Sequence, residues 1–187
     1  GRRVEQQVAL AEIVPFIDWT PFFTTWELHG VYPRILQDEK VGATARDLFT
    51  QAQEMLKLMV AESWLEARTI YGFYPAQAHG DDIHLQDAEQ TYVFHTLRQQ
   101  RLRRNDAPQL ALADFIAPVE SGLQDYLGAF VVTAGLGIEE RLTHFKAHHD
   151  DFSAILLQAL ADRLAEALAE KLHLQARQDW GYETNQD

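Results

Sequence analysis

The spacing of apolar residues changes twice along the chain, from helical to strand-like and back to helical. This sequence of patterns limits the folds that the chain can adopt. Residues 43–65 carry apolar side chains at three- and four-residue spacing, which is typical of an amphipathic helix. Residues 67–137 contain short β-rich segments instead, and residues 139–177 return to the helical spacing. Because strands are grouped between helices without regular alternation, the sequence predicts an α+β fold with a mostly antiparallel sheet, flanked by helices, and a long C-terminal helix.

The middle of the chain is expected to supply the strands. We predict them at residues 67–76, 81–87 and 125–137, the last being the most aromatic and β-branched. Residues 90–104 are expected to begin as a strand and to end as a helix. The following helical region, 139–177, has a break expected within the HHDD sequence.

The first residues divide into a lead-in and a domain. Residues 1–13 are predicted to form a lead-in or linker helix, ahead of one domain that spans 14–187 and is expected to be incomplete at its C-terminus. Three prolines exclude one continuous helix early in this domain. A short helix is expected there, with Thr20 as its N-cap, Pro21 at its first position and Gly30 as its end.

Composition excludes several classes of function. The 187 residues include no cysteine and carry a formal charge of −12. The chain therefore has no disulfide framework or thiol nucleophile, and it suits the reducing cytoplasm. An acidic protein repels phosphate backbones, so no nucleic-acid partner is expected. No apolar run approaches the roughly 20 residues that span a membrane, so no membrane partner is expected either. One arginine cluster is either a solvated helix end or a docking patch for an acidic protein: Arg98, Arg101, Arg103 and Arg104.

Two partial motifs have plain structural explanations beside their functional ones. Gly135 and Gly137 precede a helix and could cradle phosphate, but the first turn that follows is acidic, which favours an ordinary strand-to-helix turn. His144 and His148 share a helix face and could bind zinc with Asp151, although surface histidines at this spacing are common by chance.

The carboxylates are the remaining candidates. Asp162, Glu166 and Glu170 recur every four residues and therefore share one helix face, which is either solvated or turned toward a cationic ligand. Asp18 stands in the most aromatic stretch of the chain. A carboxylate buried there needs a partner, and an N-cap or an ion pair with Arg34 would also explain it.

Several blocks of the sequence occur together in a constant order. They are FIDWTPFF (16–23), YPRIL (32–36), GFYPA and GDDI (within 72–83), LADFIAP (112–118), DYLGAF (125–130), HDD (149–151) and ALADRLAEALAE (159–170). These blocks resemble the activation domain of cobalamin-dependent methionine synthase. The resemblance runs from about residue 12 to about residue 182, so it covers nearly the whole chain.

The resemblance implies a C-shaped α+β fold and a role in reactivating an enzyme. In that family the enzyme makes methionine from homocysteine and methyltetrahydrofolate through cobalamin, which a neighbouring domain binds. The activation domain binds S-adenosylmethionine and presents it to cob(II)alamin for reductive methylation. The electron comes from flavodoxin or a flavin reductase.

The same resemblance assigns two residues to S-adenosylmethionine, Asp18 and Glu166. Carboxylates suit this ligand because it carries an ammonium, a sulfonium and ribose hydroxyls. Asp162 and Glu170 have no counterpart in the assignment, and no catalytic or metal-binding residue is implied. Since the sequence offers no nucleophile or acid–base pair, we expect the domain to position cofactors and not to be catalytic by itself.

One feature of the family lies outside the sequence. Its main S-adenosylmethionine motif is an arginine followed by a Gly-Tyr-Pro block, beyond the position of Trp180–Tyr182. Without it we expect a half-built pocket and weakened binding. Two other classes of function therefore stay open. One is a non-catalytic docking module for a cobalamin domain or flavodoxin that does not bind S-adenosylmethionine. The other is a small zinc hydrolase using His144, His148 and Asp151.

Overall fold

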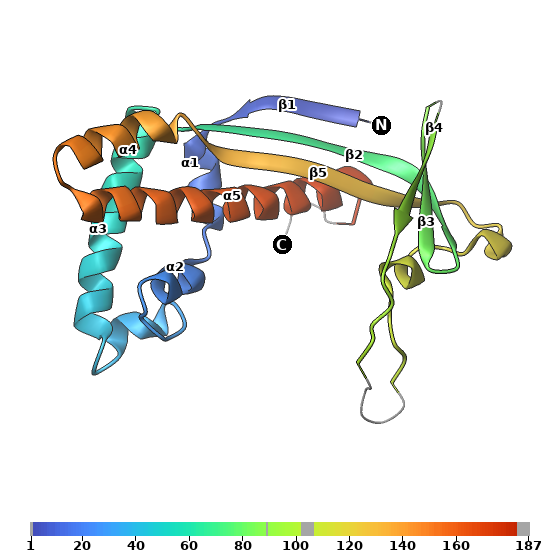
Figure 1. The fold of residues 1–187 in the computed structure, drawn as a ribbon, viewed down its shortest axis with the longest axis horizontal. Coiled ribbons are helices and arrows are strands. Elements are labelled where there is room, and N and C mark those ends of the chain that lie inside the picture. Colours follow the sequence, from blue (N-terminus) through green and yellow to red (C-terminus); the bar gives the residue numbers. More distant parts are fainter. Residues whose placement is uncertain (1, 89, 102–106, 183–187) are drawn as a thin grey trace. The chain divides into compact units, whose positions relative to one another are not determined.

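A computed structural model describes residues 2–88, 90–101 and 107–182, which fall into two compact units. We call Ile70–Val131, with residues 2–4, the sheet unit. We call Glu5–Thr69, with residues 132–182, the helical unit. Figure 1 shows the elements in chain order.

The helical unit contains the five α-helices of the described residues. They are α1 (Leu10–Ile13), α2 (Trp19–Thr25), α3 (Gly42–Ala61), α4 (Ile138–Ala147) and α5 (Asp151–Trp180), with single turns of 3-10 helix at η1 (Val14–Phe16) and η2 (Arg34–Gln37). The helix α5 packs against α1, η1, α2, α3 and α4 (Figure 1). None of the helices in the described part of the chain is long and apolar enough to cross a membrane.

The boundaries of α5 follow from its sequence. Asp150 caps the helix, because its side chain accepts the backbone N–H of Ser153 at 3.0 Å. This hydrogen bond lowers the pKa of Asp150, since it favours the ionised carboxylate. Gly181 ends the helix with φ 83°, a left-handed conformation that glycine adopts at little cost. Between α4 and α5 the chain turns at His149, where φ is 55°.

Five strands of the described residues form one sheet. They are β1 (Arg2–Val8), β2 (Glu66–His79), β3 (Asp82–Asp87), β4 (Gln90–His95) and β5 (Asp125–Leu136), in the order β1-β2-β3-β4 with β5 also paired to β2. The β2–β3 and β3–β4 pairs are antiparallel. Two further 3-10 turns, η4 (Leu112–Phe115) and η5 (Val119–Ser121), follow in the sheet unit.

These observations confirm the predicted α+β class, the antiparallel pairing and the long C-terminal helix. The helix predicted at 43–65 is α3, and the break predicted in HHDD separates α4 from α5. The strands predicted at 67–76, 81–87 and 125–137 are β2, β3 and β5.

Three predictions were wrong in detail. Residues 1–13 do not form a lead-in helix, because Arg2–Val8 is the strand β1 and only Leu10–Ile13 is helical. The helix α2 is capped by Asp18, not Thr20, and it ends at Thr25 before reaching Gly30. Finally, residues 90–104 begin as β4 but do not continue as a helix through residue 101, where the chain is irregular and Thr96 and Arg98 bond to Asp81.

Candidate functional site

Asp18 is a helix cap on the protein surface. Its Oδ1 atom accepts the backbone N–H of Thr20 at 2.9 Å, and this bond starts α2. The side chain is exposed, although its neighbours Ile17 and Trp19 are buried. The sequence placed this carboxylate inside an aromatic cluster, and that was wrong. The N-cap alternative is confirmed, whereas no ion pair joins Asp18 to Arg34 in the described structure.

Trp19, the residue after Asp18, packs within an aromatic cluster. The Trp19 ring packs edge-on against the Phe22 and Phe49 rings, with ring centroids 5.3 Å and 4.8 Å apart. The loop after α2 is fixed to the same helix, because the backbone N–H of Tyr32 donates to Thr20 Oγ1 at 3.1 Å. The start of α2, which Asp18 caps, is therefore held both by the packing of its aromatic side chains and by this hydrogen bond.

Glu166 lies on the exposed face of α5. Its neighbours in the acidic row, Asp162 and Glu170, are exposed as well, while Leu164 and Ala167 are buried on the opposite face. Asp162 pairs with the adjacent Arg163 at 2.5 Å. Within the described residues no basic side chain pairs with Glu166, so its carboxylate is available to a cation from outside the unit.

Two contacts show how the segment bearing Asp18 runs along α5. Near one end, Lys171 Nζ lies 3.3 Å from Glu12 Oε2 of α1. Near the other end, the Phe152 ring lies 5.3 Å from Trp26, just after α2. Asp18 falls between Glu12 and Trp26 in the chain, and Glu166 falls between Phe152 and Lys171. Both carboxylates therefore belong to the part of the helical unit where α1, η1 and α2 pack on α5.

The other motifs have structural roles. Gly137 links β5 to α4 with φ 91°, and a Cβ atom there would lie 3.2 Å from the Trp64 carbonyl oxygen, so this is the plain strand-to-helix turn. His148 Nδ1 lies 2.8 Å from the His144 carbonyl oxygen, and the two rings are 4.4 Å apart. Across the described ranges, no three histidine or carboxylate side chains gather in a way that could hold a metal ion.

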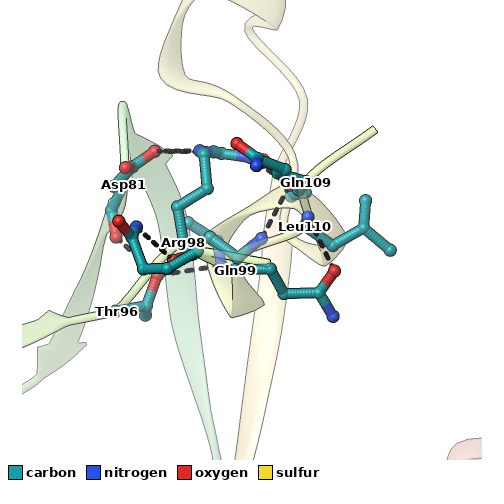
Figure 2. Close-up of polar contacts among 10 residues, drawn as sticks. Asp81, Thr96, Arg98, Gln99, Gln109 and Leu110 are labelled. Carbon is teal, nitrogen blue, oxygen red and sulfur yellow. Dashed lines mark hydrogen bonds and ion pairs between the residues drawn. The ribbon is translucent and has the colours of Figure 1, made fainter. Parts of the chain in front are cut away.

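Sequence reasoning missed an ion-pair network in the sheet unit, shown in Figure 2. Arg98 donates to the Asp81 carboxylate at 2.6 and 3.1 Å, to the Asp114 carboxylate at 2.7 and 2.8 Å, and to the Gln109 carbonyl oxygen at 2.6 Å. These bonds use all five N–H donors of the guanidinium. We call Arg98, Asp81 and Asp114 the arginine clamp.

The clamp shifts the acid–base behaviour of its members. The Arg98 guanidinium and the backbone N–H of Ala111 lower the pKa of Asp114 to about 2. The two carboxylates raise the pKa of Arg98. No local pattern could have revealed the clamp, because its acids lie 17 and 16 residues from the arginine. The prediction of a solvated arginine cluster was therefore wrong for Arg98, and Arg103 and Arg104 lie outside the described residues.

Comparisons with known proteins match the chain along almost its whole length. Residues 9–187 match the family model described as vitamin B12 dependent methionine synthase, activation domain. A solved structure titled as the MetH reactivation domain bound to AdoHcy is 45% identical, with a TM-score of 0.91. The match covers all of this chain and 58% of the solved one.

Proposed function

The chain belongs to the family of vitamin B12 dependent methionine synthase activation domains, and we propose that it binds S-adenosylmethionine and presents it to cob(II)alamin for reductive methylation. The parent enzyme would make methionine from homocysteine and methyltetrahydrofolate in the cytoplasm. The observation that carries the proposal is the AdoHcy bound by a structure of the same fold at 45% identity. AdoHcy and S-adenosylmethionine share their adenosyl and amino-acid groups.

Two exposed carboxylates of the helical unit, Asp18 and Glu166, suit such a ligand. Glu166 has no competing cation among the described residues, and Asp18 keeps one oxygen free while it caps α2. Both can accept hydrogen bonds from an ammonium or from ribose hydroxyls, and both favour positive charge nearby. Following the resemblance to the family, we assign Asp18 and Glu166 to the ligand, and neither Glu170 nor Asp162, which is paired with Arg163.

The remaining partners follow from the family. Cobalamin would be held by a neighbouring domain of the same enzyme, and flavodoxin or a flavin reductase would supply the electron. The cofactors provide the methyl-transfer chemistry, and this chain provides the binding and orientation of S-adenosylmethionine. Since this chain spans 58% of the solved relative, further ligand contacts are expected from the rest of the enzyme.

Calorimetric titration of S-adenosylmethionine tests the proposal. It would be run on this chain and on the chain extended to the length of the MetH relative, each with Glu166→Gln and with Glu170→Gln as the matched control. We expect Glu166→Gln to weaken binding about 10- to 100-fold, because a hydrogen bond to a charged group contributes about 1.5–3 kcal/mol. Glu170→Gln should leave the affinity unchanged.

The same titration separates the proposal from its alternative. If the extended chain takes up no S-adenosylmethionine at millimolar concentration, the ligand assignment fails. The domain would then be a docking module for a cobalamin domain or flavodoxin. The exposed positions of Asp18 and Glu166 agree with that alternative as well, so the ligand and not the fold decides between them.

A further inference from the structure

Histidines gather on the face of β3 that points away from the buried cluster of the sheet unit. His79 is opposite Asp82 across β2 and β3, and Asp82 is opposite His95 across β3 and β4. Directly opposite residues of antiparallel strands point to the same side, and His84 shares that side because it lies two residues after Asp82. These four side chains therefore share one face, whereas Ile83 points to the other side, where it is 3% exposed within the buried cluster.

Two of these histidines are close enough to bind one metal ion together. The rings of His79 and His84 are stacked, with centroids 3.9 Å apart and an interplanar angle of 16°. A transition-metal ion binds an imidazole nitrogen at about 2.0–2.1 Å, so two nitrogens on the same ion lie about 3–4 Å apart. His79 is exposed and His84 is partly exposed, so small rotations of the two rings suffice to turn one nitrogen of each toward a common ion.

The hairpin that carries both histidines is fixed independently of any ion. Strands β2 and β3 are joined by a two-residue turn of Gly80 and Asp81, in which Gly80 has φ 63°. Arg98 donates two hydrogen bonds to the Asp81 carboxylate, at 2.6 and 3.1 Å, so the arginine clamp anchors this turn. Because the backbone is already ordered, binding of an ion by the two side chains costs little further conformational entropy.

The surroundings of the pair favour a cation and limit its type. The Asp82 carboxylate lies on the same face, 2.9 Å from His95 Nδ1, and the whole chain carries a formal charge of −12. Within the described ranges no third histidine or carboxylate completes a metal centre. A structural zinc site uses four protein ligands. Two imidazoles with water in the other positions form the mixed nitrogen and oxygen ligand set that is typical of Ni²⁺ and Cu²⁺.

We propose that His79 and His84 form a binding site for a divalent transition-metal ion of the Ni²⁺ or Cu²⁺ type, with water in the remaining positions. The ion links β2 to β3 and thereby stabilises the hairpin, since a ligand that binds only the folded state shifts the equilibrium toward it. The inference uses none of the residues assigned to S-adenosylmethionine, and it holds whether or not that ligand binds.

Calorimetric titration of NiCl₂ into this chain, purified without a polyhistidine tag, tests the proposal. Every sample carries His148→Gln, because His144 and His148 form a second pair on α4 with ring centroids 4.4 Å apart. In that background we expect one ion per chain. His79→Gln and His84→Gln should each weaken binding at least about tenfold, because losing even a group that orients a metal ligand costs about 10- to 100-fold in affinity. His29→Gln, at an exposed histidine of the helical unit, should leave the affinity unchanged.

A second measurement locates the ion on the chain. Cu²⁺ is paramagnetic and broadens the NMR signals of nearby nuclei, so a small amount of it should first broaden the amide signals of residues 78–85. His84→Gln should abolish this effect. Saturating Ni²⁺ should also slow hydrogen exchange of the same amides. Unchanged Ni²⁺ affinity in both hairpin variants, or broadening centred outside residues 78–85, would overturn the proposal, and the stacked rings would then be a packing contact alone.

Discussion

In the helical unit, Phe22, Phe23, Leu157, Leu160 and Leu164 are completely withdrawn from water, whereas the buried cluster of the sheet unit consists of Ala76, Ala78, Ile83 and Ala113. Large side chains stabilise the first unit through apolar burial. The buried cluster of the second unit consists mostly of small side chains, and its loops are also joined by the arginine clamp. The helical unit is thus stabilised by nonspecific apolar burial, and the sheet unit by the directional hydrogen bonds of the arginine clamp.

The difference has a consequence for specificity. Apolar burial tolerates exchange of side chains with similar volume, but the clamp requires a planar five-donor group at residue 98 and acceptors at three fixed points. The sheet unit should therefore be sensitive to single polar substitutions, and the helical unit to loss of volume.

The largest effect is expected from Phe22→Ala in the helical unit. The Phe22 side chain is fully buried and contacts the rings of Trp19 and Phe23. Its removal should lower the free energy of unfolding by about 3–5 kcal/mol, through lost transfer energy and a residual cavity. Urea denaturation monitored by circular dichroism measures this change. As a control, Ile155→Ala, at a side chain that is 50% exposed, should cost less than about 1 kcal/mol.

The second prediction concerns the clamp. Arg98→Met keeps the aliphatic stem and removes all five donors, which leaves two carboxylates facing each other without a cation. Amides of β3 and β4 should exchange at least about tenfold faster, while those of α3 and α5 keep their protection. Arg68→Met, which breaks a pair with Glu66 that is largely solvent-exposed, serves as the control. Equal loss of protection in both units would show that they unfold as one, and the contrast would fail.

The sequence predicted long elements with a local pattern well in both units, among them α3, α5, β2 and β5. The spacing of Leu48, Ala52, Met55 and Met59 is a local pattern, so α3 could be placed within a few residues. Whether Glu166 is solvated could also be anticipated from its four-residue period. Its assignment to S-adenosylmethionine came from the family resemblance and not from this spacing.

The errors arose where distant residues decide the local structure. Strand β1 at Arg2–Val8 was predicted as a helix, because apolar residues four positions apart share one face in a strand as well as in a helix. The role of Arg98 depends on acids brought close by the fold. For Asp18, the aromatic neighbours in the sequence suggested burial, yet the cap holds the carboxylate at the surface.

Low pH is expected to weaken the sheet unit through Asp114. The pKa of Asp114 is lowered to about 2 from 3.8 by Arg98 and by the Ala111 N–H. A carboxyl group with a lowered folded-state pKa stabilises the fold above its ordinary pKa, and this stabilisation is lost as the pH falls toward the folded value. Protection of β3 and β4 should therefore decrease between about pH 4 and pH 2. Asp114→Asn should abolish that pH dependence.

The pKa of Asp150 is also lowered, so the start of α5 should weaken in acid while the buried core of the helical unit persists.

The smallest effect is expected at Asp18, where one residue is proposed to serve both stability and binding. Asp18→Ala removes the N-cap bond to Thr20 and should lower the free energy of unfolding by about 1 kcal/mol. Asp18→Asn keeps a capping oxygen and should leave stability nearly unchanged, because asparagine and aspartate cap equally well. Affinity for S-adenosylmethionine should respond differently: both variants lose the charge, so both should bind more weakly. If Asp18→Asn retained full affinity in calorimetry, Asp18 would be a structural cap alone, and the ligand assignment in the helical unit would rest on Glu166.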